Sequence, residues 1–320
     1  MSDEALDPEL ERAIHEDPDD DARFRVYADW MIAHGNPRGE LAAVQLERER
    51  MGTPELAARE LELLERHADQ IRGPRITRSR AQLRLDELGV ARYRGGFWRG
   101  LSIDDTLETL SMLLAHPSAR LLHTLEIAWV EDPQLQASTD FDAAVEALLG
   151  AGHSLAGLRE LRIGRAPEHQ DEHAEFPERS CSRLNQLAAV CPRLEVIRLW
   201  CPNFAMGEFP ELRWLDARTG ISAASIAAIA ATRLPKLERL DLTEDEWCGL
   251  TWPDDALDQL LEGRATPRLR HLSLVSEAAE FEPRLREKIT ASPLGRRLEL
   301  LEFDGGWSCD EGEADGFFEI

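Results

Sequence analysis

The sequence has few cysteines, and they are not arranged for a zinc ribbon or a disulfide framework. There are five, an odd number, without any closely spaced CxxC pair: Cys181, Cys191, Cys201, Cys248 and Cys309. This pattern argues against both kinds of site. We expect Cys181, Cys191 and Cys201 to line a hydrophobic core as small apolar side chains.

Long apolar runs are also missing. No stretch approaches the roughly 18 apolar residues that a membrane-spanning helix needs. The start of the chain, Met1-Ser2-Asp3-Glu4, is acidic, whereas a secretory signal has a basic start followed by an apolar run. We therefore expect a cytoplasmic protein that does not bind a membrane.

Positive charge is scarce. The chain has 61 acidic and 37 basic residues, a formal net charge of -24, and its only lysines are Lys236 and Lys288. Such a field repels phosphate backbones and anionic lipid. The composition therefore argues against nucleic-acid binding and favours a protein partner that is basic or of mixed charge.

Motifs for catalysis are absent as well. The sequence contains no GxxxxGK phosphate loop, no GxSxG elbow and no HExxH zinc motif. His169 and His173 are four residues apart beside acidic residues, but Pro167 and Pro177 bracket them and no third ligand is indicated. We predict a solvated loop there, and a protein without catalytic residues, cofactor or metal.

A repeated frame of apolar residues dominates the rest of the chain. Apolar residues occupy relative positions 1, 4 and 6 of eight frames, which begin at Trp98, Leu122, Leu158, Leu194, Leu212, Leu237, Leu269 and Leu298. The frames recur every 18 to 36 residues. Such a period is typical of leucine-rich repeats, in which each unit has one short strand and a returning segment. The sequence predicts an α/β fold: an irregular solenoid with parallel strands on its concave face and helices on its convex face.

Segments between the frames carry apolar residues at helical spacing, around 107–114, 141–149, 184–190, 221–230 and 256–261. We expect a full helix in each. Long, helix-bearing units resemble repeats of the ribonuclease-inhibitor type, and Cys191-Pro192-Arg193-Leu194 is similar to the cysteine-containing variety. The usual position-9 asparagine or cysteine is missing, however, because Pro202 stands there.

The first 72 residues read as a separate helical module, in which Asp19, Asp20 and Asp21 supply an N-cap for a second helix and the helical period places Ile32 and Leu61 inward. Asp17-Pro18-Asp19-Asp20-Asp21, Val26-Tyr27-Ala28-Asp29-Trp30 and Gly35-Asn36-Pro37-Arg38-Gly39-Glu40 resemble the repeat-companion domain, a short bacterial module found before leucine-rich repeats in myxobacteria and planctomycetes. The resemblance implies a domain partnership and no activity. Asp29, Arg38 and Glu40 could line a small ligand pocket, but a buried structural tie between Asp29 and Arg38 or the backbone is the favoured interpretation.

Two segments flank the predicted solenoid of residues 97–304. The arginine-rich junction 73–96 is expected to neutralise the acidic module before it, although it could also attract an anion. The tail 305–320 is acidic and glycine-rich and ends with Phe317, Phe318 and Ile320. We expect a cap over the open end of the core, with a detachable peptide as the alternative.

The frame also predicts which side chains face a partner. Positions 4 and 6 point inward, so positions 3, 5 and 7 point to the concave face, because side chains alternate along a strand. The predicted partner-binding residues are Arg162, Arg198, Trp200, Trp214, Asp216, Arg218, Arg239 and Asp241. Tryptophan and arginine are enriched at binding hot spots. Trp247, in the acidic–aromatic loop 243–254, is a second candidate anchor, and the alternative for Trp200 and Trp214 is that they only shield a tight stretch.

These features together predict a non-enzymatic binding protein, such as an immunity protein, an antitoxin or a signalling adaptor. The alternatives are a regulator of a small GTPase, as some leucine-rich-repeat proteins of ribonuclease-inhibitor type are, and a signalling substrate released by proteolysis. No residue of the sequence identifies the catalytic contact that the GTPase alternative needs.

Overall fold

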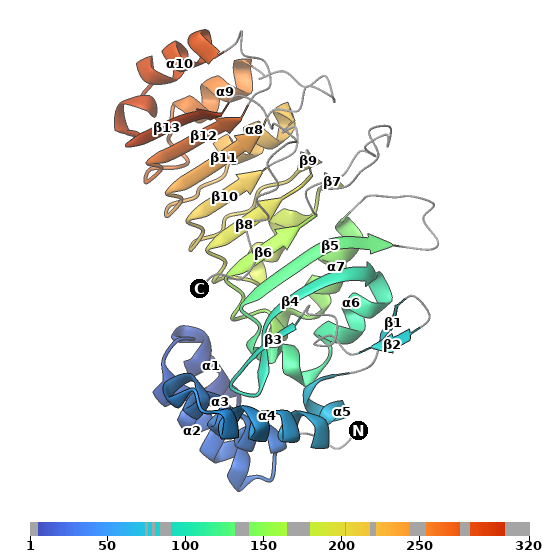
Figure 1. Cartoon of the computed structure of the whole chain (residues 1–320). Helices are drawn as coiled ribbons and strands as arrows, with labels where there is room; N and C mark the ends of the chain where they lie inside the picture. Colours follow the sequence, from blue (N-terminus) through green and yellow to red (C-terminus); the bar gives the residue numbers. More distant parts are fainter. Residues whose placement is uncertain are drawn as a thin grey trace.

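The computed structural model of the chain describes residues 6–73, 76–78, 81–83, 91–131, 141–164, 180–201, 203–217, 222–243, 254–275 and 282–304. A group of helices lies at one end of a long sheet, next to β3 and β4 (Figure 1). Within the described residues, no helix is long and apolar enough to cross a membrane.

Five helices come first: α1 (Pro8–Glu16), α2 (Asp21–Ala33), α3 (Pro37–Met51), α4 (Pro54–Arg66) and α5 (Ala68–Ile71). Their ends follow local sequence signals. Asp20 accepts a hydrogen bond from the Ala22 N–H at 2.8 Å and caps α2 as predicted. Pro37 opens α3, where its missing N–H costs nothing, and Gly52 ends that helix in the left-handed region at φ 64°.

Two side chains that the helical period placed inward are exposed instead, Ile32 by 49% and Leu61 by 56%. Met31 takes the core position in α2. In α4, Leu63 and Glu60 face α3, and Glu60 accepts a hydrogen bond from the Gln45 side chain at 2.9 Å. The buried face of α4 is therefore rotated from the predicted one, because the polar pair Gln45–Glu60 takes part in the contact between α3 and α4.

The main sheet has nine strands in the order β13-β12-β11-β10-β8-β6-β5-β4-β3. They are β3 (Ala91–Arg94), β4 (Phe97–Thr106), β5 (Thr124–Glu131), β6 (Glu160–Ile163), β8 (Val196–Leu199), β10 (Trp214–Ala217), β11 (Arg239–Thr243), β12 (His271–Val275) and β13 (Leu300–Asp304). Only the β3–β4 pair is antiparallel. The predicted α/β class is confirmed.

The pairing register follows the sequence frame. Position 3 of each frame pairs with position 3 of the next, as in Glu160 with Val196 and Val196 with Trp214. Positions 1, 4 and 6 are buried in the first seven frames and half-buried in the last, where Leu301 and Phe303 lie. One register therefore aligns all eight frames into one apolar core.

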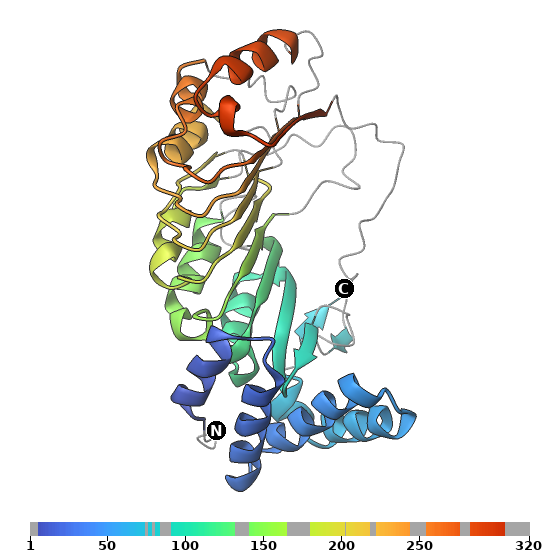
Figure 2. The same cartoon turned by 90° about the vertical axis from the view of Figure 1, so that its left-hand side faces the viewer.

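The helices α6 (Leu107–Leu114), α7 (Asp142–Gly150), α8 (Ala223–Ala231) and α9 (Asp254–Leu261) cover one face of the sheet (Figure 2). α10 (Glu282–Ala291) precedes β13. One predicted helix is wrong: residues 184–189 form the 3₁₀ helix η3 (Leu184–Ala189). Its segment holds Leu184 and Leu187 in the core over two short turns, which a tighter helix suffices to do.

Shorter elements complete the structure. Two small pairs lie outside the main sheet: β1 (Ile76–Arg78) with β2 (Ala81–Leu83), and β7 (Ser180–Cys181) with β9 (Asn203–Phe204). The other 3₁₀ helices in the described residues are η1 (Pro117–Leu121), η2 (Gly152–Ser154) and η5 (Gly295–Arg297).

The cysteines of the described region lie where the sequence placed them. Cys181, Cys191 and Cys201 are buried in the main core. Burial raises the pKa of the Cys191 thiol to about 12, because the charged thiolate would lose its hydration. These cysteines are packing residues. Cys248 and Cys309 lie outside the described residues.

Arg38 ties the helical module to the sheet. Its side chain is fully buried and donates from Nη1 to the Gly96 carbonyl at 3.0 Å and the Ser118 hydroxyl at 2.7 Å, and from Nη2 to the Gln70 carbonyl. The favoured structural interpretation is supported, but its expected Asp29 partner is wrong because Asp29 is exposed. The acceptors are instead the backbone carbonyls of Gly96 and Gln70 and the Ser118 hydroxyl.

The module and the sheet share core residues as well. The Phe97 ring stacks on Tyr27 at 5.8 Å between centroids, inside the apolar cluster of α1–α3. Arg120 donates to both Glu11 oxygens at 2.6–3.0 Å, and the Tyr27 hydroxyl donates to Glu11 at 2.9 Å. The helical module thus caps the first end of the sheet.

Part of the arginine-rich junction neutralises the module, as expected. Arg94 makes ion pairs of 3.0–3.7 Å with Asp19, Asp21 and Glu49. Arg75, Arg80 and Arg84 lie outside the described residues, as do the tail 305–320 and the loop residues His169 and His173.

Candidate protein-binding face

We call the sheet face opposite α6–α9 the open face (Figure 2). Residues at frame positions 3 and 5 belong to this face, because side chains alternate along a strand. The alternation is plain in β6 and β8, where half-buried and buried residues alternate strictly. On the middle strands, five of the predicted partner-binding residues form what we call the central patch: Arg162, Arg198, Trp200, Trp214 and Arg239.

Trp214 lies at the centre of this patch between two arginines. The guanidinium carbons of Arg198 and Arg239 lie 4.3 and 4.6 Å from the Trp214 ring centroid, and the two arginines come from β8 and β11, on either side of β10. The indole N–H donates to Asp241 at 2.7 Å, and Arg239 Nε donates to the same carboxylate at 2.7 and 3.0 Å. Cation–π and charge-assisted contacts therefore fix the ring and both cations in place.

Glu160 organises the other half of the patch. Its Oε1 lies 2.8 Å from Arg162 and 3.6 Å from Arg198. All three residues are half-buried, since about a fifth of each side chain is exposed. With Glu160 and Asp241, four of the five patch residues, all except Trp200, thus form a connected array across β6, β8, β10 and β11.

Trp200 stands apart from this array. It follows β8 at frame position 7 and lies against Gly164, where an added Cβ would come within 2.7 Å of the Trp200 Cβ. Gly164 has a φ of 86°, so only glycine suits both its own backbone conformation and the close approach of the Trp200 Cβ and backbone. In the part of the chain that the structure describes, the half-exposed indole has no hydrogen-bond or ring partner. The Trp200 side chain is therefore available for contact with a partner.

The carboxylates predicted to bind a partner lie deeper. Asp216 is fully buried and Asp241 is 8% exposed. Asp241 supports the patch through its hydrogen bonds with Trp214 and Arg239, and burial leaves both carboxylates little surface for a partner. Arg218 and Trp247 lie outside the described residues.

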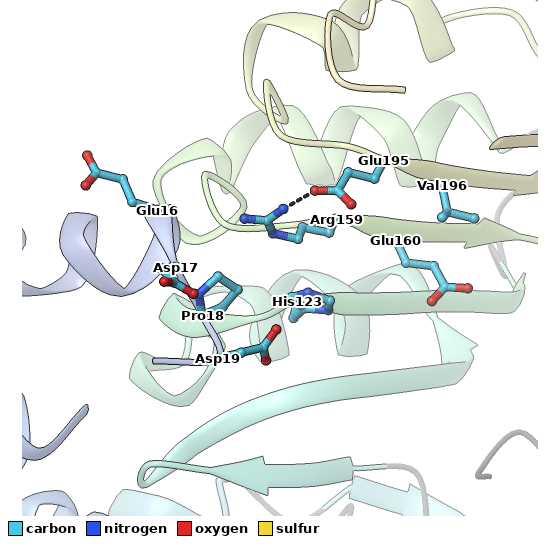
Figure 3. Close-up of a pocket in the computed structure, with 9 residues that line it drawn as sticks. All are labelled: Glu16, Asp17, Pro18, Asp19, His123, Arg159, Glu160, Glu195 and Val196. Atoms are coloured by element: carbon cyan, nitrogen blue, oxygen red, sulfur yellow. Dashed lines mark hydrogen bonds and ion pairs between the residues drawn. The ribbon is translucent and has the colours of Figure 1, made fainter. Parts of the chain in front are cut away.

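A cleft of about 410 Å³ adjoins the open face. It lies between the α1–α2 turn and the amino ends of β5, β6 and β8 (Figure 3). Its lining consists of Glu16, Asp17, Pro18, Asp19, His123, Arg159, Glu160, Glu195 and Val196. Glu160 and Val196 belong to the open face as well, so the cleft continues that face toward the helical module.

Burial and nearby arginines determine the protonation state of His123, which lines the cleft. The pKa of His123 is lowered to about 3, first by burial and then by Arg99 and Arg159. Arg99 donates to Asp19 at 3.0 Å, and burial lowers its pKa to about 10. His123 is therefore neutral at physiological pH. In the described residues, no three histidine, cysteine or carboxylate side chains gather as a metal site.

One feature of this edge was missed by sequence reasoning, although the frame contains it. Position 2 of the eight frames holds Arg99, His123, Arg159, Glu195, Arg213, Glu238, Arg270 and Glu299. Ion pairs join Arg159 with Glu195, Arg213 with Glu238 and Arg270 with Glu299. Successive strands place these residues side by side, so alternating charge becomes a ladder.

Comparisons with known proteins leave the family open. No family model matches the sequence, and no curated protein matches it. The fold does have a counterpart: the crystal structure of a Bacteroides fragilis protein, a target of the Northeast Structural Genomics Consortium, is similar with a TM-score of 0.52. The match has 16% sequence identity and covers 77% of this chain and 67% of that one. This likeness concerns the fold alone.

Proposed function

We propose that the chain is an irregular leucine-rich-repeat solenoid with an N-terminal repeat-companion module, and that it binds a protein partner on the open face without catalysing a reaction. The observation that carries the proposal is the central patch. Arginine and tryptophan, the residue types that dominate binding hot spots, converge there from four adjacent strands.

The support for repeats is the common frame. Eight frames supply eight parallel strands in one register, so each strand starts at the same side of the sheet as the one before it. A stack of this kind leaves one sheet face without helices and makes an extended binding surface. The leucine-rich-repeat assignment accounts for both.

The patch is preorganised for binding. Trp214, Arg198 and Arg239 already hold one another, so a partner does not have to order these long side chains. Burial of Asp216 and Asp241 leaves the cations as the outer layer of the patch. Cations in the patch of a chain with a net charge of -24 suit a cytoplasmic protein partner of mixed charge, and the same net charge disfavours nucleic acid.

Affinity capture from lysate of the source cells tests this function. A protein retained by the parent chain should be lost with Trp200→Ala and with Arg239→Ala, and kept by Arg264→Ala, which removes an arginine that is 87% exposed between α9 and β12. The interaction is then measured with the purified partner. Equal binding by the parent and both patch variants would refute the assignment of the open face.

A further inference from the structure

The C-terminal segment 305–320 is complementary to the central patch: it is acidic where the patch is basic, and both contain aromatic residues. It contains Asp310, Glu311, Glu313, Asp315 and Glu319, has no lysine or arginine, and includes Phe317 and Phe318. The proposal rests on the proposed function, because it concerns the same surface. We propose that this segment docks in cis on the central patch and competes there with the protein partner.

The patch presents its cations outward. Of the Arg239 side chain 41% is exposed, against 12% of the Asp241 side chain beneath it. Arg239 bonds Asp241 through Nε, and a guanidinium has four further N–H donors for a second carboxylate. An acidic peptide therefore finds donors at the surface, while the carboxylates that position them lie underneath.

The segment begins in a suitable place. Asp304 ends β13 at frame position 7, the level at which Trp200 follows β8. Three strand spacings of about 4.8 Å separate β13 from β10, and four separate β13 from β8. Measured across the sheet, perpendicular to the strands, these distances are about 14 and 19 Å. Residues 305–309 can span about 17 Å when extended. The acidic stretch 310–315 can thus lie over Arg239 and Arg198.

The aromatic residues can then reach Trp200. Phe317 and Phe318 follow that stretch after Gly316, and glycines at 305, 306 and 312 allow the changes of direction that a path across the strands requires. A tethered segment of this length has an effective concentration on the order of millimolar at its target. Even a weak contact is therefore well populated, and a partner has to displace it.

The test uses the full chain with a nitroxide label on Cys309. Cys248→Ser leaves Cys309 as the target, because Cys181, Cys191 and Cys201 are buried. Indole N–H signals are recorded by NMR and assigned with single Trp→Phe variants. The Trp200 and Trp214 signals should lose most of their intensity, while those of Trp30 and Trp98, in the helical module and β4, keep theirs.

Charge variants establish the cause of the broadening. Neutralising Asp310, Glu311, Glu313 and Asp315, or replacing Arg198 and Arg239 by Gln, should restore most of the lost intensity, whereas Arg264→Gln should not. About 1 M salt, where the Debye length is about 3 Å, should act like the charge variants. Full intensity of Trp200 and Trp214 in the labelled parent would overturn the proposal.

A mixing experiment separates docking in cis from docking on a second copy. Labelled chain without ¹⁵N is mixed with unlabelled ¹⁵N chain, and the Trp200 and Trp214 signals should keep their intensity. Broadening that arises equally in the mixture would overturn docking in cis. These measurements involve no partner, so their failure is distinct from failure of the capture experiment on the open face.

Discussion

At the scale of single residues, the chain uses arginine chiefly to join distant segments. Arg38 bridges backbone carbonyls of the module and the sheet end, Arg120 grips Glu11, and Arg94 binds the acidic α1–α2 turn. A planar guanidinium can serve several acceptors at once, which a lysine cannot do in the same geometry. The near absence of lysine noted in the sequence is thus matched by a structural use of arginine.

Arg38→Ala should lower the free energy of unfolding by roughly 3–5 kcal/mol, since it leaves buried carbonyls and the Ser118 hydroxyl without their donor and opens a cavity. Urea denaturation measures the change. Arg25→Ala, at an exposed position of the same helical module, is the control and should change stability little. A loss below about 1 kcal/mol for Arg38→Ala would contradict the role of the residue as a tie.

His123 makes stability depend on pH in a defined direction. Its folded-state pKa of about 3 lies below the unfolded value near 6.5, so the unfolded chain binds the proton first. The contribution of His123 to the free energy of unfolding is complete above pH 6.5. It falls as the pH drops toward 3, by at most about 1.4 kcal/mol per pH unit. His116, whose pKa is lowered to about 4 by burial and Arg38, adds a second contribution in the same direction.

Between pH 7.5 and 5, the free energy of unfolding should therefore fall less for His123→Gln than for the parent. Urea denaturation at each pH gives the slopes. His34→Gln, at an exposed position, should retain the parental slope. Identical slopes for the parent and His123→Gln would mean that the imidazole is not kept neutral by the fold.

At the scale of elements, the β3–β4 hairpin joins the helical module to the first repeat frame. Its turn, Gly95-Gly96, has φ values of 58° and 81°, which suit glycine. At Gly96 an added Cβ would lie 2.7 Å from the Arg38 carbonyl oxygen. Conformation and close approach both require glycine at this turn.

Gly96→Ala should thus cost about 2–4 kcal/mol, the sum of backbone strain and displacement of Arg38. Gly35→Ala is a matched control: Gly35 has a φ of 71° but no atom within 4 Å of an added Cβ, so strain alone costs about 1 kcal/mol. Thermal unfolding compares the two variants. Equal losses would show that contact with Arg38 does not matter.

At the scale of the whole molecule, the helical module and the sheet share one boundary core. Phe97 of β4 and Leu121 of η1 belong to the apolar cluster of α1–α3, and the Glu11–Arg120 pair joins residues 109 positions apart. Separating the two parts would expose this shared core and break a buried ion pair, which costs free energy. The two parts should unfold as one unit.

Urea unfolding followed by far-UV circular dichroism and by tryptophan fluorescence should therefore give coincident transitions. Glu11→Ala leaves Arg120 and the Tyr27 hydroxyl without their acceptor. It should therefore shift both unfolding curves equally and lower the free energy of unfolding by about 3 kcal/mol. Glu9→Ala, at an exposed position of α1, should leave both in place. Two separate transitions in the parent would show that the module folds independently.

The sequence by itself determined the strands, their order and the side chains that face each way. It could do so because the apolar positions of the repeated frame leave one register that buries them in the first seven frames and half-buries them in the last. It also predicted most returning helices, the capping residues of the first module and the buried cysteines. These features depend on local spacing, which a single sequence displays.

Only the tertiary structure decided how side chains from different frames meet. Trp214 lies between Arg198 and Arg239 because β8, β10 and β11 are neighbours, and the two carboxylates predicted as contacts prove to be buried. The replacement of a helix by η3, the partners of Arg38 and the cleft beside the α1–α2 turn depend likewise on contacts between segments far apart in the chain. Distances between such segments are set by packing, which no local pattern encodes.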